Sequence, residues 1–145
     1  MPVAAGGTAV PIRVVFILLE GSLVLDWAGP AEALRIANQL LQTSGQPARF
    51  ALEFAGPQPQ AQGSVGIALA KLAPLPRDWN GPAWMVLVGQ PGQTIDVSGA
   101  PAQALLHWLR GQRLARGRLE LMTICAGAVL AAHAGLLAAR RATTH

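Results

Sequence analysis

The chain has 145 residues, of which 52% are hydrophobic and 12% charged, so it is too apolar for a disordered protein and long enough for one domain. Eleven basic and seven acidic side chains give a net charge of +4, which does not by itself indicate a nucleic-acid-binding protein. The single cysteine, Cys125, excludes an internal disulfide and a cysteine-based zinc site, and it fits a reducing, cytoplasmic compartment.

Neither end of the sequence indicates export or membrane insertion. Residues 1–11 are mostly small and include glycine and proline, so we expect a flexible N-terminal tail rather than a signal peptide. The longest apolar stretch, residues 126–139, contains His133 and is shorter than the roughly 18 residues of a membrane span. It therefore predicts a buried helix.

The expected strands follow from continuous apolar runs, which are typical of strands covered on both faces of a parallel sheet. The runs at residues 13–19 and 84–88 predict two such strands, and a further strand is expected at residues 119–124. A second short strand is expected at residues 50–55 and a minor one at 64–70, whereas the Pro/Gln/Gly-rich segment 56–63 predicts a loop. Residues 142–144 predict the start of one more extended segment.

Helices are expected after several of these strands. Apolar residues recur at helical spacing from residue 28 to 41, with Pro30 at a helix start, and from residue 102 to 109, with Ser98 as a possible cap. A third helix is expected at 126–133, ending before Gly135. This alternation predicts an α/β fold, a doubly wound parallel sheet with helices on both faces.

The junction at Cys125 is the first candidate site. There a strand passes at once into a helix that begins with Ala126 and Gly127, and small residues permit a sharp turn like a nucleophile elbow. A thiol at that point projects above the carboxyl edge of the sheet, and the helix N-terminus favours the thiolate. The alternative is that Cys125 is simply a small buried hydrophobic residue.

Asp26 is the second candidate, because it follows the first strand and precedes the expected helix. An aspartate in that place is also an ordinary helix cap. If the strands that precede Asp26 and Cys125 are neighbours in a parallel sheet, both residues open on the same crevice. The sequence therefore predicts that the carboxyl group of Asp26 lies close enough to hydrogen-bond the sulfur of Cys125.

Other chemistry has little support. His107 and His133 lie in helical segments without a cluster of further ligands, so we expect no metal. The glycines of residues 81–92 lack the spacing of a nucleotide-binding loop, so we expect no cofactor. The arginines of residues 110–118 fit a solvated connection between a helix and a strand, and we expect no DNA binding by this part of the chain.

Two segments resemble the ThiJ/PfpI superfamily, whose flavodoxin-like domain is related to class I glutamine amidotransferases. TICAGAVLAAHAGLLAARRATTH is similar to its elbow-to-histidine segment, with Cys125 at the nucleophile position and His145 at the histidine position. LLEGSLVLDWAGPAEAL is similar to its first strand–loop–helix, with Asp26 at the acidic position. The resemblance spans residues 12–145 and implies an incomplete domain, truncated at its C-terminus, because the family continues with further elements.

Two subgroups of this superfamily compete. Ala37-Asn38 and the AGLL and RRATTH segments are similar to the sensor domains of AraC-type transcriptional regulators, whereas isonitrile-hydratase-like enzymes share only the Asp and Cys positions. The regulator is favoured over the enzyme. It implies an unidentified small-molecule effector, a homodimer, and DNA binding through a C-terminal domain absent from this chain.

The expected ligand pocket departs from the family pattern at two places. Gly89, Gln90, Pro91 and Gly92 stand where relatives usually have a Pro-Gly-Gly turn, and Ala126 and Gly127 follow the cysteine where many have Thr-Gly. The first departure alters the shape of the loop, and the second removes a hydroxyl beside the cysteine. Both affect the place where an oxyanion would be stabilised.

Overall fold

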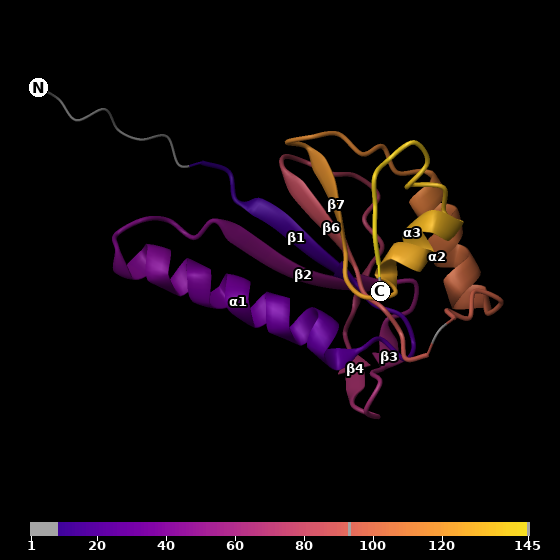
Figure 1. Cartoon of the computed structure of the whole chain (residues 1–145). Coiled ribbons are helices and arrows are strands. Elements are labelled where there is room, and N and C mark those ends of the chain that lie inside the picture. The colour runs from indigo at the N-terminus through magenta and orange to yellow at the C-terminus, as the bar shows by residue number, and fades with distance from the viewer. Residues whose placement is uncertain (1–8, 93, 145) are drawn as a thin grey trace, which may run out of the picture.

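We describe the protein from a computed structural model, which describes residues 9–92 and 94–144. The elements in chain order are β1 (Ile12–Ile17), α1 (Val24–Thr43), β2 (Phe50–Gly56), β3 (Gln60–Gln62), β4 (Ala68–Ala70), β5 (Ala73–Pro74), β6 (Ala83–Leu87), α2 (Ala100–Arg110), β7 (Leu119–Thr123) and α3 (Gly127–His133). Helix α1 covers one face of the central sheet, while α2 and α3 cover the other (Figure 1). The predicted α/β fold with helices on both faces is thereby confirmed.

The central sheet has five strands in the order β5-β2-β1-β6-β7, and every neighbouring pair is parallel. Strand β1 lies between β2 and β6, with Val15 opposite Glu53 on one side and opposite Met85 on the other. Strands β3 and β4 form a separate antiparallel hairpin below the sheet in Figure 1. The carboxyl ends of β1, β6 and β7 therefore meet at one edge.

Alternate residues of β1 and of the two residues that follow it supply two cores. Val14, Phe16 and Leu18 pack toward α1, and Val15, Ile17 and Leu19 pack toward α2 and α3. All six side chains are buried. A strand that must bury both faces has no place for polar side chains, which explains its unbroken apolar run.

Several expected boundaries were wrong for local reasons. Helix α1 begins at Val24, so Pro30 lies inside it rather than at its start. Helix α2 is preceded by Gly99 as N-cap, without a side-chain cap from Ser98. The glutamines of β3 pair with β4, so segment 56–63 is not only loop. The segment 142–144 forms no strand.

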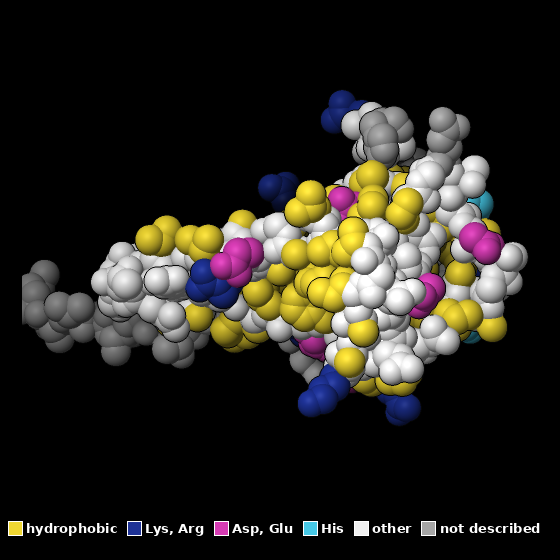
Figure 2. All heavy atoms as spheres, turned by 90° about the horizontal axis from the view of Figure 1, so that it is seen from below, with side chains coloured by type: hydrophobic (Ala, Val, Ile, Leu, Met, Phe, Trp, Pro, Cys, Tyr) yellow, Lys and Arg dark blue, Asp and Glu magenta, His cyan; other side chains and the backbone are white. Residues whose placement is uncertain are grey.

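The surface formed by α1 and the hairpin is unusually apolar for an exposed helix. Leu25 and Val65 are 82% and 77% exposed, and Leu40 is 62% exposed. Figure 2, which views this side, shows hydrophobic side chains gathered near the centre of the face. Because α1 carries apolar residues such as Leu25 and Leu40 on its exposed side as well, the spacing of its apolar residues identifies the buried face less clearly than in α2.

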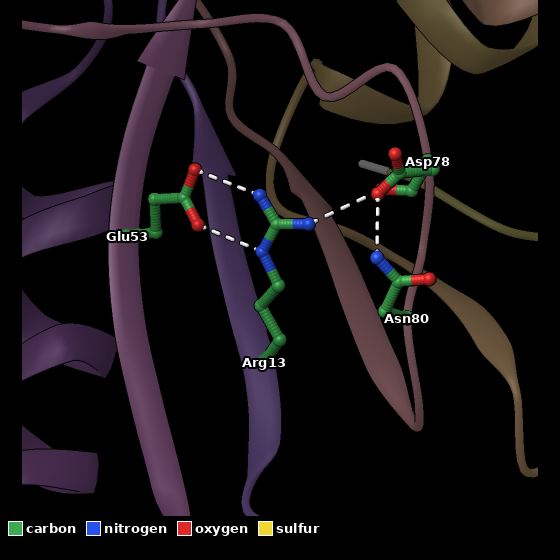
Figure 3. A network of polar contacts seen from close by, with 4 residues as sticks. All are labelled: Arg13, Glu53, Asp78 and Asn80. Atoms are coloured by element: carbon green, nitrogen blue, oxygen red, sulfur yellow. Dashed lines mark hydrogen bonds and ion pairs between the residues drawn. The ribbon is translucent and has the colours of Figure 1, made fainter.

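The amino end of the sheet is held by a polar network around Arg13. Its guanidinium donates to both carboxylate oxygens of Glu53, at 2.8 and 2.9 Å, and to the main-chain carbonyl of Asp78 at 3.2 Å (Figure 3). The Glu53 carboxylate raises the pKa of Arg13 above its ordinary value through this hydrogen bond. Asn80 donates to the Asp78 carboxylate, and the indole of Trp79 lies 5.5 Å from the guanidinium carbon. The network joins β1, β2 and the segment that leads into β6.

Candidate functional site

Cys125 occupies the sharp turn between β7 and α3. Its φ of +52° lies in the left-handed region of backbone conformation, which residues other than glycine adopt only under steric strain. Such a conformation at a strand-to-helix turn is typical of a nucleophile elbow, and the elbow at Cys125 stays a prediction. The cysteine is partly accessible and is not buried as a core residue, which argues against the alternative of a small buried hydrophobic residue.

Gly127 makes this turn possible from the other side. A Cβ atom placed on it would lie 2.2 Å from the carbonyl oxygen of Leu87, at the end of β6. The first residue of α3 therefore passes directly over the neighbouring strand, and only glycine leaves room for that approach. Gly127 is thus a packing residue of the site.

Asp26 lies in the first turn of α1, two residues after the helix begins. The helix has no side-chain cap, so the ordinary capping role expected as an alternative for Asp26 is wrong. Instead its Oδ2 accepts a hydrogen bond of 3.3 Å from the main-chain N–H of Gly89. Pro30 has no N–H, so it gives the main-chain carbonyl of Asp26 no helical hydrogen bond.

Gly89 is the point at which the two candidate residues meet. A Cβ atom on Gly89 would lie 3.2 Å from Cβ of Cys125, 3.3 Å from Oδ2 of Asp26 and 2.8 Å from the main-chain nitrogen of Ala126. The elements that carry Asp26 and Cys125 are therefore adjacent across this glycine. The structure brings these two residues together although their strands are not neighbours, because β6 lies between β1 and β7.

The loop after β6 borders the site and is tied to the loop after β1. The Gly89 carbonyl accepts from the N–H of Leu23 at 3.0 Å, and the Gln90 side-chain amide donates to the Glu20 carbonyl. Pro91 and Gly92 are exposed, and Gly92 has a φ of +99°. Of the six expected pocket residues, Gly89 and Ala126 contact the Asp26–Cys125 region, and Gly127 acts through packing.

Other predicted residues lie elsewhere. His145 lies outside the described residues, while His107 and His133 are exposed on α2 and α3. In the described part of the chain no group of histidine, cysteine and carboxylate side chains could hold a metal ion. The hydroxyl of Thr144 donates to the carbonyl of Cys125 at 3.1 Å, a contact that no sequence pattern indicated.

The region combines a partly accessible cysteine with the carboxyl group of Asp26 and the main chain of Gly89 and Ala126. The sulfur offers a nucleophile, and Asp26 offers a hydrogen-bond acceptor fixed by Gly89. Within the described ranges, no helix is long and apolar enough to span a membrane.

The chain is similar in sequence to a bacterial protein. No protein-family profile matches the chain. It is 35% identical, over 95% of its length and 90% of the other's, to an uncharacterized Streptomyces lividans protein encoded in the 5′ region of cpoL. The chain belongs to the same family as this Streptomyces protein.

Solved structures agree on the fold. A Vibrio parahaemolyticus protein described as a transcriptional regulator matches 94% of this chain and 68% of its own, with TM-score 0.67 and 22% identity. An AraC family transcriptional regulator from Pseudomonas putida matches 89% and 74%, with TM-score 0.53 and 19% identity. A ThiJ/PfpI family protein from Pseudomonas syringae matches 94% and 53%, with TM-score 0.58 and 16% identity. The fold is that of the ThiJ/PfpI superfamily, as the two sequence segments predicted.

Proposed function

We propose that this chain is the effector-sensing part of an AraC-type transcriptional regulator that works in the cytoplasm, and that a DNA-reading domain belongs to the same protein outside these residues. The observation that carries the proposal is the match to the Vibrio regulator, which extends over 94% of the chain. The Ala37-Asn38 and RRATTH segments, similar to those of such sensors, support it. None of the three described helices forms a helix-turn-helix unit with another, since strands separate them in the chain.

The effector site in this proposal is the region around Cys125, Asp26 and Gly89. Oδ2 of Asp26 and the main-chain nitrogen of Ala126 both lie within 3.3 Å of the position that a Cβ atom on Gly89 would take, so they supply hydrogen-bonding groups on the same side of this glycine. A small molecule bound here would touch α1, the loop after β6 and α3 together. Because these elements come from both faces of the sheet, binding can be transmitted to either helical layer.

The shared site is tested by thiol alkylation. Asp26→Asn removes the acidic group beside the sulfur but keeps an oxygen that can accept the Gly89 N–H. Because a negative charge on the carboxyl group disfavours the thiolate, we expect iodoacetamide to alkylate Cys125 several-fold faster in this variant. Glu32→Gln, an exposed carboxylate on α1, is the matched control and should leave the rate unchanged. A slower reaction of Asp26→Asn would mean that the carboxyl group donates to the sulfur. Equal rates for all three proteins would refute the pairing.

A second function is favoured by one observation, the strained φ of +52° at Cys125, which is typical of catalytic elbows. It is an isonitrile-hydratase-like or other ThiJ/PfpI hydrolase or lyase with Cys125 as nucleophile. Loss of a small isonitrile in the presence of the chain, abolished by Cys125→Ala, would favour the enzyme over the sensor. Tight, sequence-selective DNA binding by residues 1–145 alone would also contradict the sensor proposal.

The proposed regulator is a homodimer, and helix α1 offers a surface for a second copy. Its outward stripe is formed by Leu25, Gly29, Ala33, Ile36 and Leu40, all exposed and spaced three or four residues apart. Small residues at the middle of the stripe allow two helices to approach closely. Light scattering should give a dimer mass for the parent and a monomer mass for Ile36→Glu/Leu40→Glu.

A further inference from the structure

We infer that this chain carries a surface for nucleic-acid phosphates, made of arginines and distinct from the candidate effector site. We define this arginine face as Arg77 together with all six arginines from Arg110 to Arg141. They come from the segment before β6, from the end of α2 and the loop after it, and from the segment after α3. All seven side chains are exposed.

The arginine face is continuous. Arg113 lines a hollow of about 420 Å³ together with Arg77 and Arg118, and it also lines a second hollow of about 290 Å³. Arg140 links that second hollow to a third, of about 440 Å³, beside β7. Residues far apart in sequence thus form one concave, basic surface.

The face carries the protein's excess of positive charge. Its hollows are lined by seven arginines and by Glu120 as the one carboxylate among the described residues. The remainder of the chain has four basic and six acidic side chains. Asp78, next to Arg77 in sequence, already accepts a hydrogen bond from Asn80. The net charge of +4 is therefore unevenly distributed: the arginine face is strongly positive, and the remainder of the chain is slightly negative.

These arginines are also unsatisfied within the described part of the chain. None of the seven makes a side-chain hydrogen bond or an ion pair there, whereas Arg13 binds Glu53 and Arg35 binds Glu32. Like charges held close together repel one another, and an anion that binds among them relieves that repulsion. Their donors are available for an external partner.

Phosphodiester backbone fits this face better than a lipid surface does. Arginine binds phosphate oxygens with two parallel N–H donors, and a nucleic acid offers a regular series of phosphates to several arginines. A membrane-binding surface would add apolar anchors among the charges. None of the exposed large hydrophobic residues, Val10, Leu25, Ile36, Leu40, Val65, Ile67 and Met122, lines the three hollows.

The binding we propose does not depend on base sequence. The face is built mainly from loops and has no helix placed to enter a groove, so its contacts are to the backbone, which carries no sequence information directly. The sequence predicted no DNA binding because only the arginines of residues 110–118 could be seen as one cluster. The structure adds Arg77, Arg140 and Arg141. This inference stands independently of the sensor function.

Fluorescence anisotropy with a labelled, random-sequence DNA duplex of about 20 base pairs tests the inference. We expect the whole chain to bind it with a Kd of about 1–100 μM at low salt, and log Kobs to fall against log[salt] with a slope of about −3 to −5. The reversal Arg77→Glu/Arg113→Glu/Arg118→Glu should weaken binding at least about tenfold. The control Arg35→Glu/Arg49→Glu/Lys71→Glu has the same net charge and should weaken it less than about threefold.

Several outcomes would overturn the inference. No binding at low salt, equal losses in both triple variants, or tighter binding to phosphatidylserine vesicles than to the duplex would each do so. If the first variant fails to fold by circular dichroism, Arg140→Glu/Arg141→Glu replaces it, since those residues lie outside helices and strands. Strong preference for one duplex sequence would contradict the sensor proposal, while loss of binding only in the arginine-face variants would still support this surface.

Discussion

The two ends of the central sheet are built on different principles. At the amino end, Arg13 joins β1 to β2 through Glu53, and the indole N–H groups of Trp79 and Trp108 donate to Gln112 and to the carbonyl of Pro76. At the carboxyl end, glycines allow close approach and Cys125 adopts a strained φ. The amino end therefore fixes the strands through side-chain hydrogen bonds, while the carboxyl end uses small residues to bring main chain and reactive groups together.

The largest effect is expected where the carboxyl end is tightest. Gly127→Ala would place a methyl group 2.2 Å from the Leu87 carbonyl oxygen, so helix or strand must shift, and we expect a loss of about 3 kcal/mol or more of unfolding free energy. Urea denaturation, monitored by circular dichroism, measures this loss of unfolding free energy. The matched control is Gly29→Ala in α1, where no atom lies within 4 Å and a gain of about 0.5–1 kcal/mol is expected. A similar small gain for Gly127→Ala would show that the close approach is absent.

The next effect concerns the amino end. Arg13→Met keeps much of the side-chain stem but leaves the half-buried Glu53 carboxylate without its bidentate partner, so we expect a loss of about 1.5 kcal/mol. The exposed Arg35–Glu32 pair is the control, and Arg35→Met should not measurably change the denaturation midpoint. Alkylation of Cys125 should stay the same in Arg13→Met. A changed alkylation rate would mean that the two ends are coupled.

The regular elements and the core could largely be predicted from sequence, because β6 and the part of β1 after Arg13 are continuous apolar runs and α2 repeats its apolar residues at helical spacing. Helix α1 was harder. Its exposed Leu25 and Leu40 blur the pattern, and Pro30 indicates a start where the helix in fact continues. The hairpin of β3 and β4 was missed in part, since β3 is a strand of only three residues, two of them glutamine, and shows no hydrophobic alternation.

The candidate site around Asp26 and Cys125 could likewise be predicted only in part from the sequence. The sharp turn at Cys125 could be predicted from a strand running into small residues, but the approach of Asp26 to Cys125 depends on Gly89, which belongs to neither motif. The strands that precede Asp26 and Cys125 are not neighbours, as the prediction assumed, because β6 lies between β1 and β7. Of the arginine face only the cluster of residues 110–118 could be recognised in the sequence, since Arg77, Arg140 and Arg141 join it only through the packing of the folded chain.

A smaller effect measures the strain at Cys125. Both Cys125→Ala and Cys125→Gly remove the thiol, but only glycine adopts a φ of +52° without a steric penalty. We therefore expect Cys125→Gly to be more stable than Cys125→Ala by about 0.5–1 kcal/mol in chemical denaturation. Ala139, which also has a positive φ, provides a control through Ala139→Gly at a position remote from the candidate site. Equal stability of the two Cys125 variants would contradict a strained elbow.

The smallest effect lies in the loop that leaves the carboxyl end. The N–H and the hydroxyl of Ser98 both donate to the Asp96 carboxylate, at 2.9 and 2.6 Å, and these bonds lower the pKa of Asp96 below its ordinary value. A lowered pKa in the folded state means a stabilising contribution that is complete above the unfolded pKa, near 3.9, and is lost as the pH falls through the folded value.

A carboxyl-carbon NMR titration should give Asp96 a pKa below the ordinary value, and Ser98→Ala should move that pKa upward because the hydroxyl donor is lost. The main-chain N–H donor remains in this variant, so we expect only partial recovery. Since Asp96 is fully exposed, water screens the interaction, and the variant should unfold at nearly the same temperature as the parent at neutral pH. An unchanged Asp96 pKa in Ser98→Ala would show that the loop does not hold this turn in solution.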